Sequence, residues 1–371
     1  QNIGAGRPGV AYQARQLGLA FNAVLGVIMS LFLSLGAGTI LSGVGVADAL
    51  MQPAKTYLQI VGGFCILNAL IPICSSYLRA FGFSKEPLYA SIIGNVINFC
   101  LNAFFLFVLH KGVAGVATAT VISRIINLVI VVLLGAVLVK AKQHPERESN
   151  RAVMGQIIRI GLPSACETAI YNVSMTLVIR FLNQMDAQGL NVTARSYTMQ
   201  ITNFSYCVGA ALAQANAIMT GWHIGAKEYD ACDRGTKKAA VIGVIVAVIL
   251  ETVFTLCSGW IMQLFSKDPQ MVSLVGKLLA IDIVLEIGRV TNLVYGQALK
   301  TSGDAVFPVV MGACFMILCS VGGTYLFGIR LGLLAVGAYI GMTGDECVRA
   351  VGMYLRWKSG KWKEKGLVKS R

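Results

Sequence analysis

Residues 113–139 read VAGVATATVISRIINLVIVVLLGAVLV, and this stretch decides the fold of the chain. It contains a single charged side chain, Arg124. A helix needs about 20 consecutive apolar residues to cross the hydrocarbon core of a bilayer. Strands of membrane barrels instead alternate apolar and polar residues over about ten positions, which this stretch does not do. The stretch therefore predicts a transmembrane α-helix.

The composition extends this prediction to the whole chain. Of its 371 residues, 56% are hydrophobic and only 13% are charged, about half the charged share of a soluble domain. Such a composition excludes a soluble enzyme, a disordered chain and a disulfide-stapled secreted module. The ten cysteines form no CxxC pair, so no metal or redox motif is indicated. No GxxxxGK[ST] loop occurs, so we expect no enzyme activity, ATP hydrolysis included.

Similar apolar stretches recur along the sequence and predict an all-α polytopic membrane protein. About ten helices are expected, and their boundaries are uncertain by several residues. The predicted helices cover residues 17–42, 55–80, 87–109, 113–139, 157–183, 194–220, 237–262, 272–299, 306–328 and 333–355.

One polar stretch in the interior divides the chain, KAKQHPERESNR at residues 140–151, with Pro145 and no apolar periodicity. The predicted organisation is an N-terminal lobe of four spans, a linker, a C-terminal lobe of six spans and a basic tail. Their ranges are 1–139, 140–156, 157–355 and 356–371.

Basic residues are distributed unequally over the predicted loops. The loops on one side, together with the linker and the tail, hold about 20 Lys and Arg, and those on the other side hold about four. Because cytoplasmic loops carry the excess of positive charge, the linker and the tail are expected in the cytoplasm and the chain in the inner cell membrane. The net charge of +14 is thus a topology signal that indicates contact with membrane lipids and no binding of nucleic acid.

The two lobes repeat each other at a shift of about 220 residues. Ile3-Gly4-Ala5 then falls on Ile224-Gly225-Ala226, and Gly112 to Val116 falls near Gly332 to Val336. Both copies have the same predicted sidedness, which is typical of the parallel lobes of secondary transporters. The second lobe has two spans before its Ile-Gly-Ala phrase, and the first has none. We therefore expect ten helices of a twelve-helix parent that lacks its first two, with a true ten-span protein as the alternative.

Several phrases resemble the multidrug and toxic compound extrusion (MATE) family. They include Leu78-Arg79-Ala80-Phe81-Gly82, Ile160-Gly161-Leu162-Pro163-Ser164 and Leu299-Lys300-Thr301-Ser302-Gly303-Asp304, and their order extends over nearly the whole chain. The resemblance implies a monomeric secondary antiporter that exports drugs or organic cations by alternating access, driven by inward H⁺ or Na⁺ and without a cofactor. The chain departs from the family at its front, where two further helices are expected.

Charged residues within the predicted spans are costly and are therefore candidates for function. Most lie in the second lobe. The candidates for binding the coupling cation or the substrate are Glu167, Asp282, Glu286, Arg289, Asp345 and Arg349, and Glu251 stands singly in its span. The spacing also allows intrahelical ion pairs, Glu286 with Arg289 and Asp345 with Arg349, which would only orient the helices.

Glu167 and Asp282 have no basic residue within a turn of their own helix. A lone carboxylate in apolar surroundings can bind and release a proton, and two that face one cavity can hold Na⁺ or an organic cation. The family resemblance implies an acid early in the span 157–183 and a second one in the span 272–299. Glu167 with Asp282 or Glu286 fits that pattern, so a possible Na⁺ site is expected at Glu167 and Asp282.

Polar and aromatic side chains also follow one face of the span 194–220 at intervals of three or four residues. They are expected to line the cavity or, equally, to pack in the core: Tyr197, Gln200, Asn203 and Tyr206. The asparagines of the first lobe, Asn95, Asn98, Asn102 and Asn127, favour hydrogen bonds between helices.

Two other functions fit parts of the pattern. A flippase for lipid-linked sugars is built on similar lobes but needs a cavity rich in Arg and Lys, whereas the charges in these spans are mostly acidic. A channel or a non-transporting scaffold needs no two-lobed repeat, and no re-entrant filter sequence is visible.

Overall fold

The computed structural model describes residues 1–44, 48–140, 146–185 and 189–367. Throughout this described part the chain is helical and contains no strand, which confirms the all-α class. Within these described ranges, five helices are long and apolar enough to cross a bilayer, and the bent pair Asp48–Gly62 and Ile66–Ala80 makes a sixth candidate. Three further long helices, α8 (Leu190–Gly225), α11 (Pro269–Ser302) and α13 (Leu334–Lys358), carry most of the buried charges of the described residues. The chain divides into two compact units, Arg7–Ile157 and Gln1–Gly6 with Ile158–Arg371.

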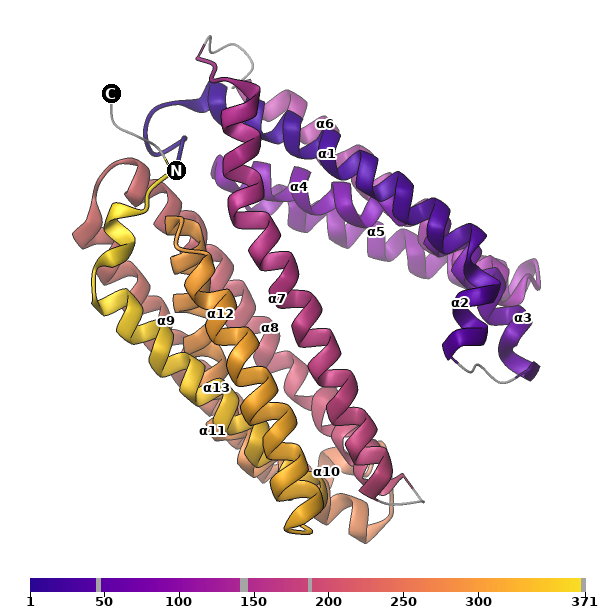
Figure 1. The fold of residues 1–371 in the computed structure, drawn as a ribbon. Helices are drawn as coiled ribbons and strands as arrows, with labels where there is room; N and C mark the ends of the chain where they lie inside the picture. Colours follow the sequence, from indigo (N-terminus) through magenta and orange to yellow (C-terminus); the bar gives the residue numbers. More distant parts are fainter. Residues whose placement is uncertain (45–47, 141–145, 186–188, 368–371) are drawn as a thin grey trace. The chain divides into compact units, whose positions relative to one another are not determined.

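The first unit, Arg7–Ile157, is built mainly from α1 to α6, and residues 113–139 form its last long helix (Figure 1). Its core lies around Tyr77, Leu78 and Val131. One span is broken after η1 and bends by 41° before α4. The elements are α1 (Pro8–Leu35), α2 (Ala37–Val44), α3 (Asp48–Tyr57), η1 (Leu58–Gly62), α4 (Ile66–Ala80), α5 (Lys85–Ala103), η2 (Phe104–Val108) and α6 (Gly112–Leu138).

The second unit is a bundle in which α11 packs against α8, α9 and α13 (Figure 1). The apolar core of this unit surrounds α11, with Leu278, Leu285 and Val294 fully buried. The elements are α7 (Asn150–Met185), α8 (Leu190–Gly225), α9 (Tyr229–Leu256), α10 (Ser258–Met262), α11 (Pro269–Ser302), α12 (Val306–Phe315), η4 (Met316–Val321), η5 (Thr324–Arg330), α13 (Leu334–Lys358) and η6 (Lys361–Glu364).

Glycines set how closely the helices of this bundle approach α11. A Cβ atom at Gly209 on α8 or at Gly243 on α9 would lie 2.8 or 2.7 Å from the side chain of Val290. A Cβ atom at Gly288 would lie 2.8 Å from the backbone nitrogen of Cys347 on α13. Small residues at such crossings permit close packing of membrane helices. The polar side chains one or two turns away are thereby brought within reach of one another.

The repeat seen in the sequence is reproduced in the local backbone of each unit. A glycine with positive φ follows each of α4 and α11, Gly82 at 90° two residues after Ala80 and Gly303 at 101° directly after Ser302. The next residue in each copy donates its N–H to the carbonyl five residues back, Phe83 to Leu78 and Asp304 to Leu299. These are the bonds of a Schellman-type helix end.

The tail beyond α13 folds back onto the end of the second unit. Trp362 of η6 stacks on Trp357 with ring centroids 4.1 Å apart, and both rings are buried. Asp304, in the turn between α11 and α12, accepts hydrogen bonds from Arg356 at 2.7 Å and Lys365 at 2.9 Å. We call this arrangement the tail clasp. It fixes the end of α11.

Candidate functional site

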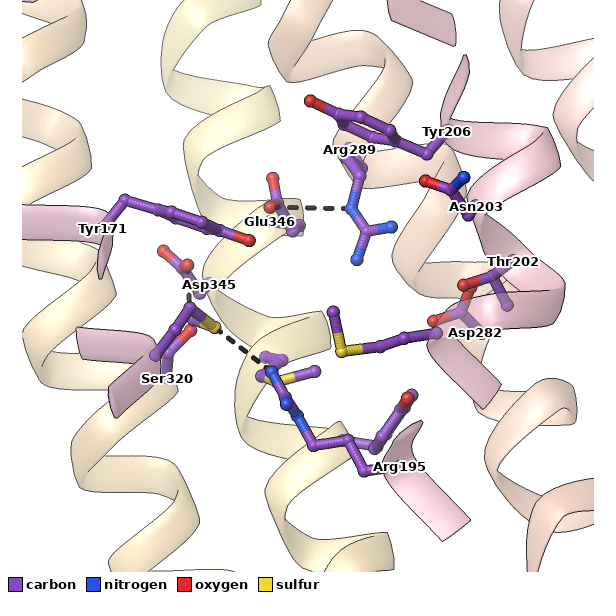
Figure 2. A pocket seen from close by; sticks show the side chains of 14 residues that line it. Tyr171, Arg195, Thr202, Asn203, Tyr206, Asp282, Arg289, Ser320, Asp345 and Glu346 are labelled. Atoms are coloured by element: carbon purple, nitrogen blue, oxygen red, sulfur yellow. Dashed lines mark hydrogen bonds and ion pairs between the residues drawn. The ribbon is translucent and has the colours of Figure 1, made fainter. Parts of the chain in front are cut away.

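A cavity of about 240 Å³ lies within the second unit, between α7, α8, α11, η4 and α13. Figure 2 shows charged and aromatic side chains that converge on it. The lining residues are Tyr171, Met175, Arg195, Met199, Thr202, Asn203, Tyr206, Asp282, Arg289, Ser320, Tyr339, Met342, Asp345 and Glu346. The walls combine flat rings and flexible methionines with carboxylates, a surface suited to amphipathic ligands.

A second cavity of about 390 Å³ adjoins the first. Tyr171, Tyr206, Arg289 and Glu346 line both, so these four side chains stand at the boundary between the two. The second cavity extends to Glu167 on α7, Lys300 and Asn292 on α11, Met316 on η4, and Arg349 on α13.

Asp345, Glu346 and Arg349 form an ion-paired group on α13. Arg349 lies 2.8 Å from a carboxylate oxygen of Asp345 and 2.8 Å from one of Glu346. Ser320 donates a hydrogen bond of 2.9 Å to Asp345. The intrahelical pair that the sequence allowed between Asp345 and Arg349 is therefore present. A buried pair of this kind is held by its additional hydrogen bonds as much as by its charges.

Arg289 connects two helices. Its guanidinium is hydrogen-bonded to Glu286, one turn earlier on α11. It also lies 3.9 Å from Glu346 across the cavity, the contact drawn in Figure 2. Asn292 donates a 3.0 Å hydrogen bond to the other oxygen of Glu346. Arg289 is thus positioned to pair with either Glu286 or Glu346.

Behind the cavity, three buried carboxylates converge: Glu251 on α9 and Asp282 and Glu286 on α11. One oxygen of each lies within 4.8 Å of the others. Glu251 and Glu286 are fully buried, and Asp282 is 2% exposed. Both oxygens of Glu251, Oδ2 of Asp282 and Oε2 of Glu286 have no hydrogen-bond partner in the described structure. We call this group the acid trio.

The sequence pattern that could have revealed the acid trio lies on α9. Gly243, Ala247 and Glu251 are spaced by four residues and share one helix face. Gly243 on this face approaches Val290 of α11 closely, so Glu251, two turns later on the same face, also lies against α11. Sequence reasoning placed Glu251 in its span but assigned it no neighbours.

Glu167 lies apart from the acid trio. Its carboxylate is 2.5 Å from Nζ of Lys300, at the end of α11, and it packs beside Gly312 of α12. The expectation that Glu167 has no basic neighbour on its own helix holds, but another helix supplies one. Glu167 lines the second cavity and Asp282 the first. A shared Na⁺ site at these two residues therefore stays a prediction without support from the cavity lining.

The polar face predicted on α8 divides between two roles. Asn203 and Tyr206 line the cavity, as Figure 2 shows. Tyr197 instead packs on Phe265, with ring centroids 5.3 Å apart, and Gln200 is exposed outside the lining.

Sequence reasoning missed two basic side chains of this region, Arg195 and Lys300. Arg195 is 6% exposed, and its closest polar contact is the sulfur of Met175 at 3.7 Å. The signal for Arg195 was present, since it is a lone basic residue in the span expected over 194–220.

Comparisons with known proteins now bear on this arrangement. The MatE family model matches residues 1–104 and 163–326. The chain is 32% identical to the uncharacterized transporter YisQ of Bacillus subtilis over 99% of its own length and 82% of that protein. It is 22% identical to the probable multidrug resistance protein NorM of Thermotoga maritima over 91% of the chain and 76% of that protein.

A solved structure shares the fold. The outward-facing conformation of a multidrug resistance MATE family transporter superposes with a TM-score of 0.87 at 18% identity. The alignment covers 98% of this chain and 82% of that one. The extent of the family match and the identity to YisQ show that the chain belongs to the MatE family, the multidrug and toxic compound extrusion family of multi-pass membrane transporters.

Proposed function

We propose that the protein exports small organic cations by alternating access and that inward movement of H⁺ or Na⁺ drives the export. The observation that carries the proposal is the cavity of Figure 2, where Asp282, Asp345 and Glu346 converge with the rings of Tyr171 and Tyr206. Aromatic rings attract organic cations through their faces, by about 0.5 to 2 kcal/mol each. Carboxylates beside such rings select for positive charge. The names of multidrug-resistance relatives agree with a substrate of this class.

The balance of charge favours exchange of cations over simple binding. Among the described residues, four acidic and four basic side chains line the two cavities. Glu251 and Glu286 behind them bring the formal charge of the whole group to −2. An arriving cation therefore competes with the basic side chains of the protein for carboxylates that those side chains already hold. Such a competition lets a cation from the opposite side displace the substrate.

The residues proposed to take part are the six candidates from the sequence, together with Glu346 and Lys300. Glu346 is proposed as the direct contact for the substrate, because it lines both cavities and can exchange its partners Arg349 and Asn292 and the more distant Arg289 for a cation. Asp282 and Glu286 are proposed to bind the coupling cation. Arg349 and Asp345 are proposed to orient Glu346. Glu167 and Lys300 form a second acid–base pair that substrate or proton binding opens.

The orientation and assembly form part of the same proposal. The linker and the basic tail face the cytoplasm, as their Lys and Arg content favours. The exposed apolar side chains of α1, α5 and α6 contact membrane lipids. The transporter works as a monomer, because each described cavity lies within one unit of a single chain.

The test uses inverted membrane vesicles that contain the protein, with a fluorescent lipophilic cation added outside and H⁺ or Na⁺ concentrated in the lumen. We expect gradient-dependent movement of the dye, reduced at least about tenfold by Glu346→Gln, since a charge-assisted contact contributes 1.5–3 kcal/mol. Glu364→Gln, in the exposed tail helix η6, is the matched control and should transport normally. Dye movement equal to that of protein-free vesicles under both gradients would overturn the proposal. Movement of a lipid-linked sugar in such vesicles would favour a flippase instead.

A further inference from the structure

Arg195 on α8 is a buried arginine that forms no ion pair with any described residue. It is 6% exposed, and Nε of its guanidinium has no hydrogen-bond partner in the described structure. Its Nη2 atom reaches only the sulfur of Met175, at 3.7 Å. A thioether sulfur is a weak acceptor, so this contact does little to replace the water that an exposed guanidinium would bind. The charge of Arg195 is therefore poorly compensated in the protein alone.

The other two arginines that line the cavities are paired. Arg289 and Arg349 each bind at least one carboxylate. The cavity that Arg195 lines does contain acidic side chains, but none of them is bonded to Arg195 among the described contacts: Asp282, Asp345 and Glu346. The fold thus keeps this positive charge and these negative charges apart within a single cavity.

The position of Arg195 on α8 directs it to the cavity. Arg195, Met199, Thr202 and Tyr206 recur at intervals of three or four residues, so they share one face of the helix, and all four line the cavity. Figure 2 shows Arg195 at one end of the cavity and Glu346 toward the other. A molecule that extends along the cavity would meet an acidic group at one end and a basic group at the other.

We propose that Arg195 binds a carboxylate of the transported molecule, so that the preferred substrate is a zwitterion whose cationic group lies at Glu346. A guanidinium presents its N–H groups in a planar fork that matches the two oxygens of a carboxylate. The unpartnered Nε belongs to that fork. The inference rests on the proposed function, since it narrows the substrate class of the same cavity and adds a residue that determines specificity.

The charge of the first cavity favours a single carboxylate over a group of higher charge. Three acidic and two basic side chains line it, which gives a formal charge of −1. A carboxylate neutralises Arg195, whereas the second charge of a dianion such as a phosphate monoester would face the acidic side chains without a partner. Simple organic cations still bind at Glu346, but they leave Arg195 as poorly compensated as it is in the empty cavity.

The test compares two dyes that share one cationic ring system. Rhodamine 110 carries a free carboxylate, and rhodamine 123 is its methyl ester. Binding of each dye to the purified protein in detergent is measured by fluorescence anisotropy at neutral pH without any gradient. We expect the parent protein to bind rhodamine 110 more tightly. Arg195→Gln should weaken rhodamine 110 at least about tenfold, because a charge-assisted hydrogen bond is lost. It should leave the affinity for rhodamine 123 unchanged or raise it.

Two further variants separate recognition from damage to the fold. Arg195→Lys keeps the charge but loses the fork, so its affinity for rhodamine 110 should lie between those of Arg195→Gln and the parent protein. Arg330→Gln removes an exposed arginine that lines neither cavity, and both dyes should bind it as they bind the parent. The apparent Tm of Arg195→Gln without dye should equal or exceed that of the parent, because a buried and poorly compensated charge is removed.

The carboxylate site would be overturned by a parent protein that binds rhodamine 110 no more tightly than rhodamine 123, or by equal losses of both dyes in Arg195→Gln. A lower Tm of that variant with weaker binding of both dyes would make Arg195 a structural residue. Gradient-driven movement of rhodamine 123, beside unchanged binding of rhodamine 110 to Arg195→Gln, would refute the carboxylate site alone. Binding of rhodamine 110 that depends on Arg195, without movement of either dye in vesicles, would refute export and leave the site standing.

Discussion

The two units differ in the polar residues that they bury. In the unit Arg7–Ile157 the interior polar groups are amides and hydroxyls. Asn98 donates to Ser123 at 3.3 Å, and Asn102 donates to Asn98 at 3.0 Å. In the other unit the buried polar groups also include charges, among them the acid trio and the Arg349 group. The two units share the backbone conformation at Gly82 and Gly303, so they differ in the chemistry of their buried side chains and not in these helix ends.

This difference indicates a division of labour. Hydrogen bonds between amides in a membrane contribute about 0.6 kcal/mol on average, so they hold helices together at little cost. Buried charges cost more than they return in stability unless each one is paired. A unit that keeps many of them gives up stability, and under the proposed function it gains the capacity to exchange ions. The comparison predicts that single substitutions will have much larger effects in the second unit.

The largest effect is expected from Arg349→Ala. Removal of this guanidinium leaves Asp345 and Glu346 with uncompensated charge, and breaking a buried ion pair from one side costs about 3–5 kcal/mol. We expect a marked fall in the apparent Tm of the detergent-solubilised protein. Arg349→Lys keeps the charge but loses the paired geometry, so its apparent Tm should lie between those of Arg349→Ala and the parent protein.

Arg124→Ala is the matched control from the first unit. Arg124 lies on α6, is half-buried and makes no ion pair with any described residue. Its loss should change the Tm little. Equal losses of Tm for Arg124→Ala and Arg349→Ala would show that the two units do not differ in the way that the comparison requires.

An intermediate effect is expected from Asp304→Asn, in the tail clasp. Burial alone would raise the pKa of Asp304, but the hydrogen bonds and positive charges of Arg356 and Lys365 outweigh it and hold the pKa below its ordinary value. Asp304 therefore contributes stability at neutral pH, which is lost as the pH falls below the unfolded value of about 3.9 and through the folded pKa. Tryptophan fluorescence with acrylamide quenching should report opening of the clasp in acid.

The repeat supplies the control for the clasp. Phe83 stands where Asp304 does in the other copy, and it donates the equivalent backbone bond without any ion pair. At neutral pH, Asp304→Asn should already increase quenching, and the remaining change on acidification should be smaller than in the parent. An unchanged acid response in Asp304→Asn would mean that other carboxylates open the tail.

The helical fold could be predicted from the sequence because each helix in a membrane must satisfy its own backbone, so apolar length alone indicates a span. The stretch 113–139 became α6 over Gly112–Leu138. Helix breaks were not predictable in the same way. The π-helical turns η4 and η5 follow within a single apolar run, where side-chain packing and not sequence composition decides the hydrogen-bond register.

The site was predictable only as far as a single helix extends. Asp345 with Arg349 and Glu286 with Arg289 followed from spacing along one helix. The convergence of Glu251 on α11 depends on close contacts at Gly243 that involve two helices. The interval of four residues from Gly243 to Glu251 marks one face of α9 but does not indicate which helix that face contacts.

The smallest effect is expected from Asn98→Ala in the first unit. Asn98 donates to Ser123 and accepts from Asn102, and an interhelical bond of this kind contributes about 0.6 kcal/mol. A double-mutant cycle with Ser123→Ala, measured by unfolding in detergent, isolates that interaction. Asn95→Ala, an exposed position one turn earlier, should be neutral.

A coupling energy of several kcal/mol in that cycle would contradict the expectation that polar contacts in the first unit contribute little to stability. The side-chain hydrogen bond between Asn98 and Ser123 would then be as costly to break as the charged contacts around Arg349. The two units would no longer differ in the cost of losing a polar contact. A coupling near 0.6 kcal/mol, beside a loss of about 3–5 kcal/mol for Arg349→Ala, would instead show that charged contacts in the second unit contribute more to stability than amide hydrogen bonds in the first. The two measurements together test whether charge, and not helix packing, distinguishes the repeats.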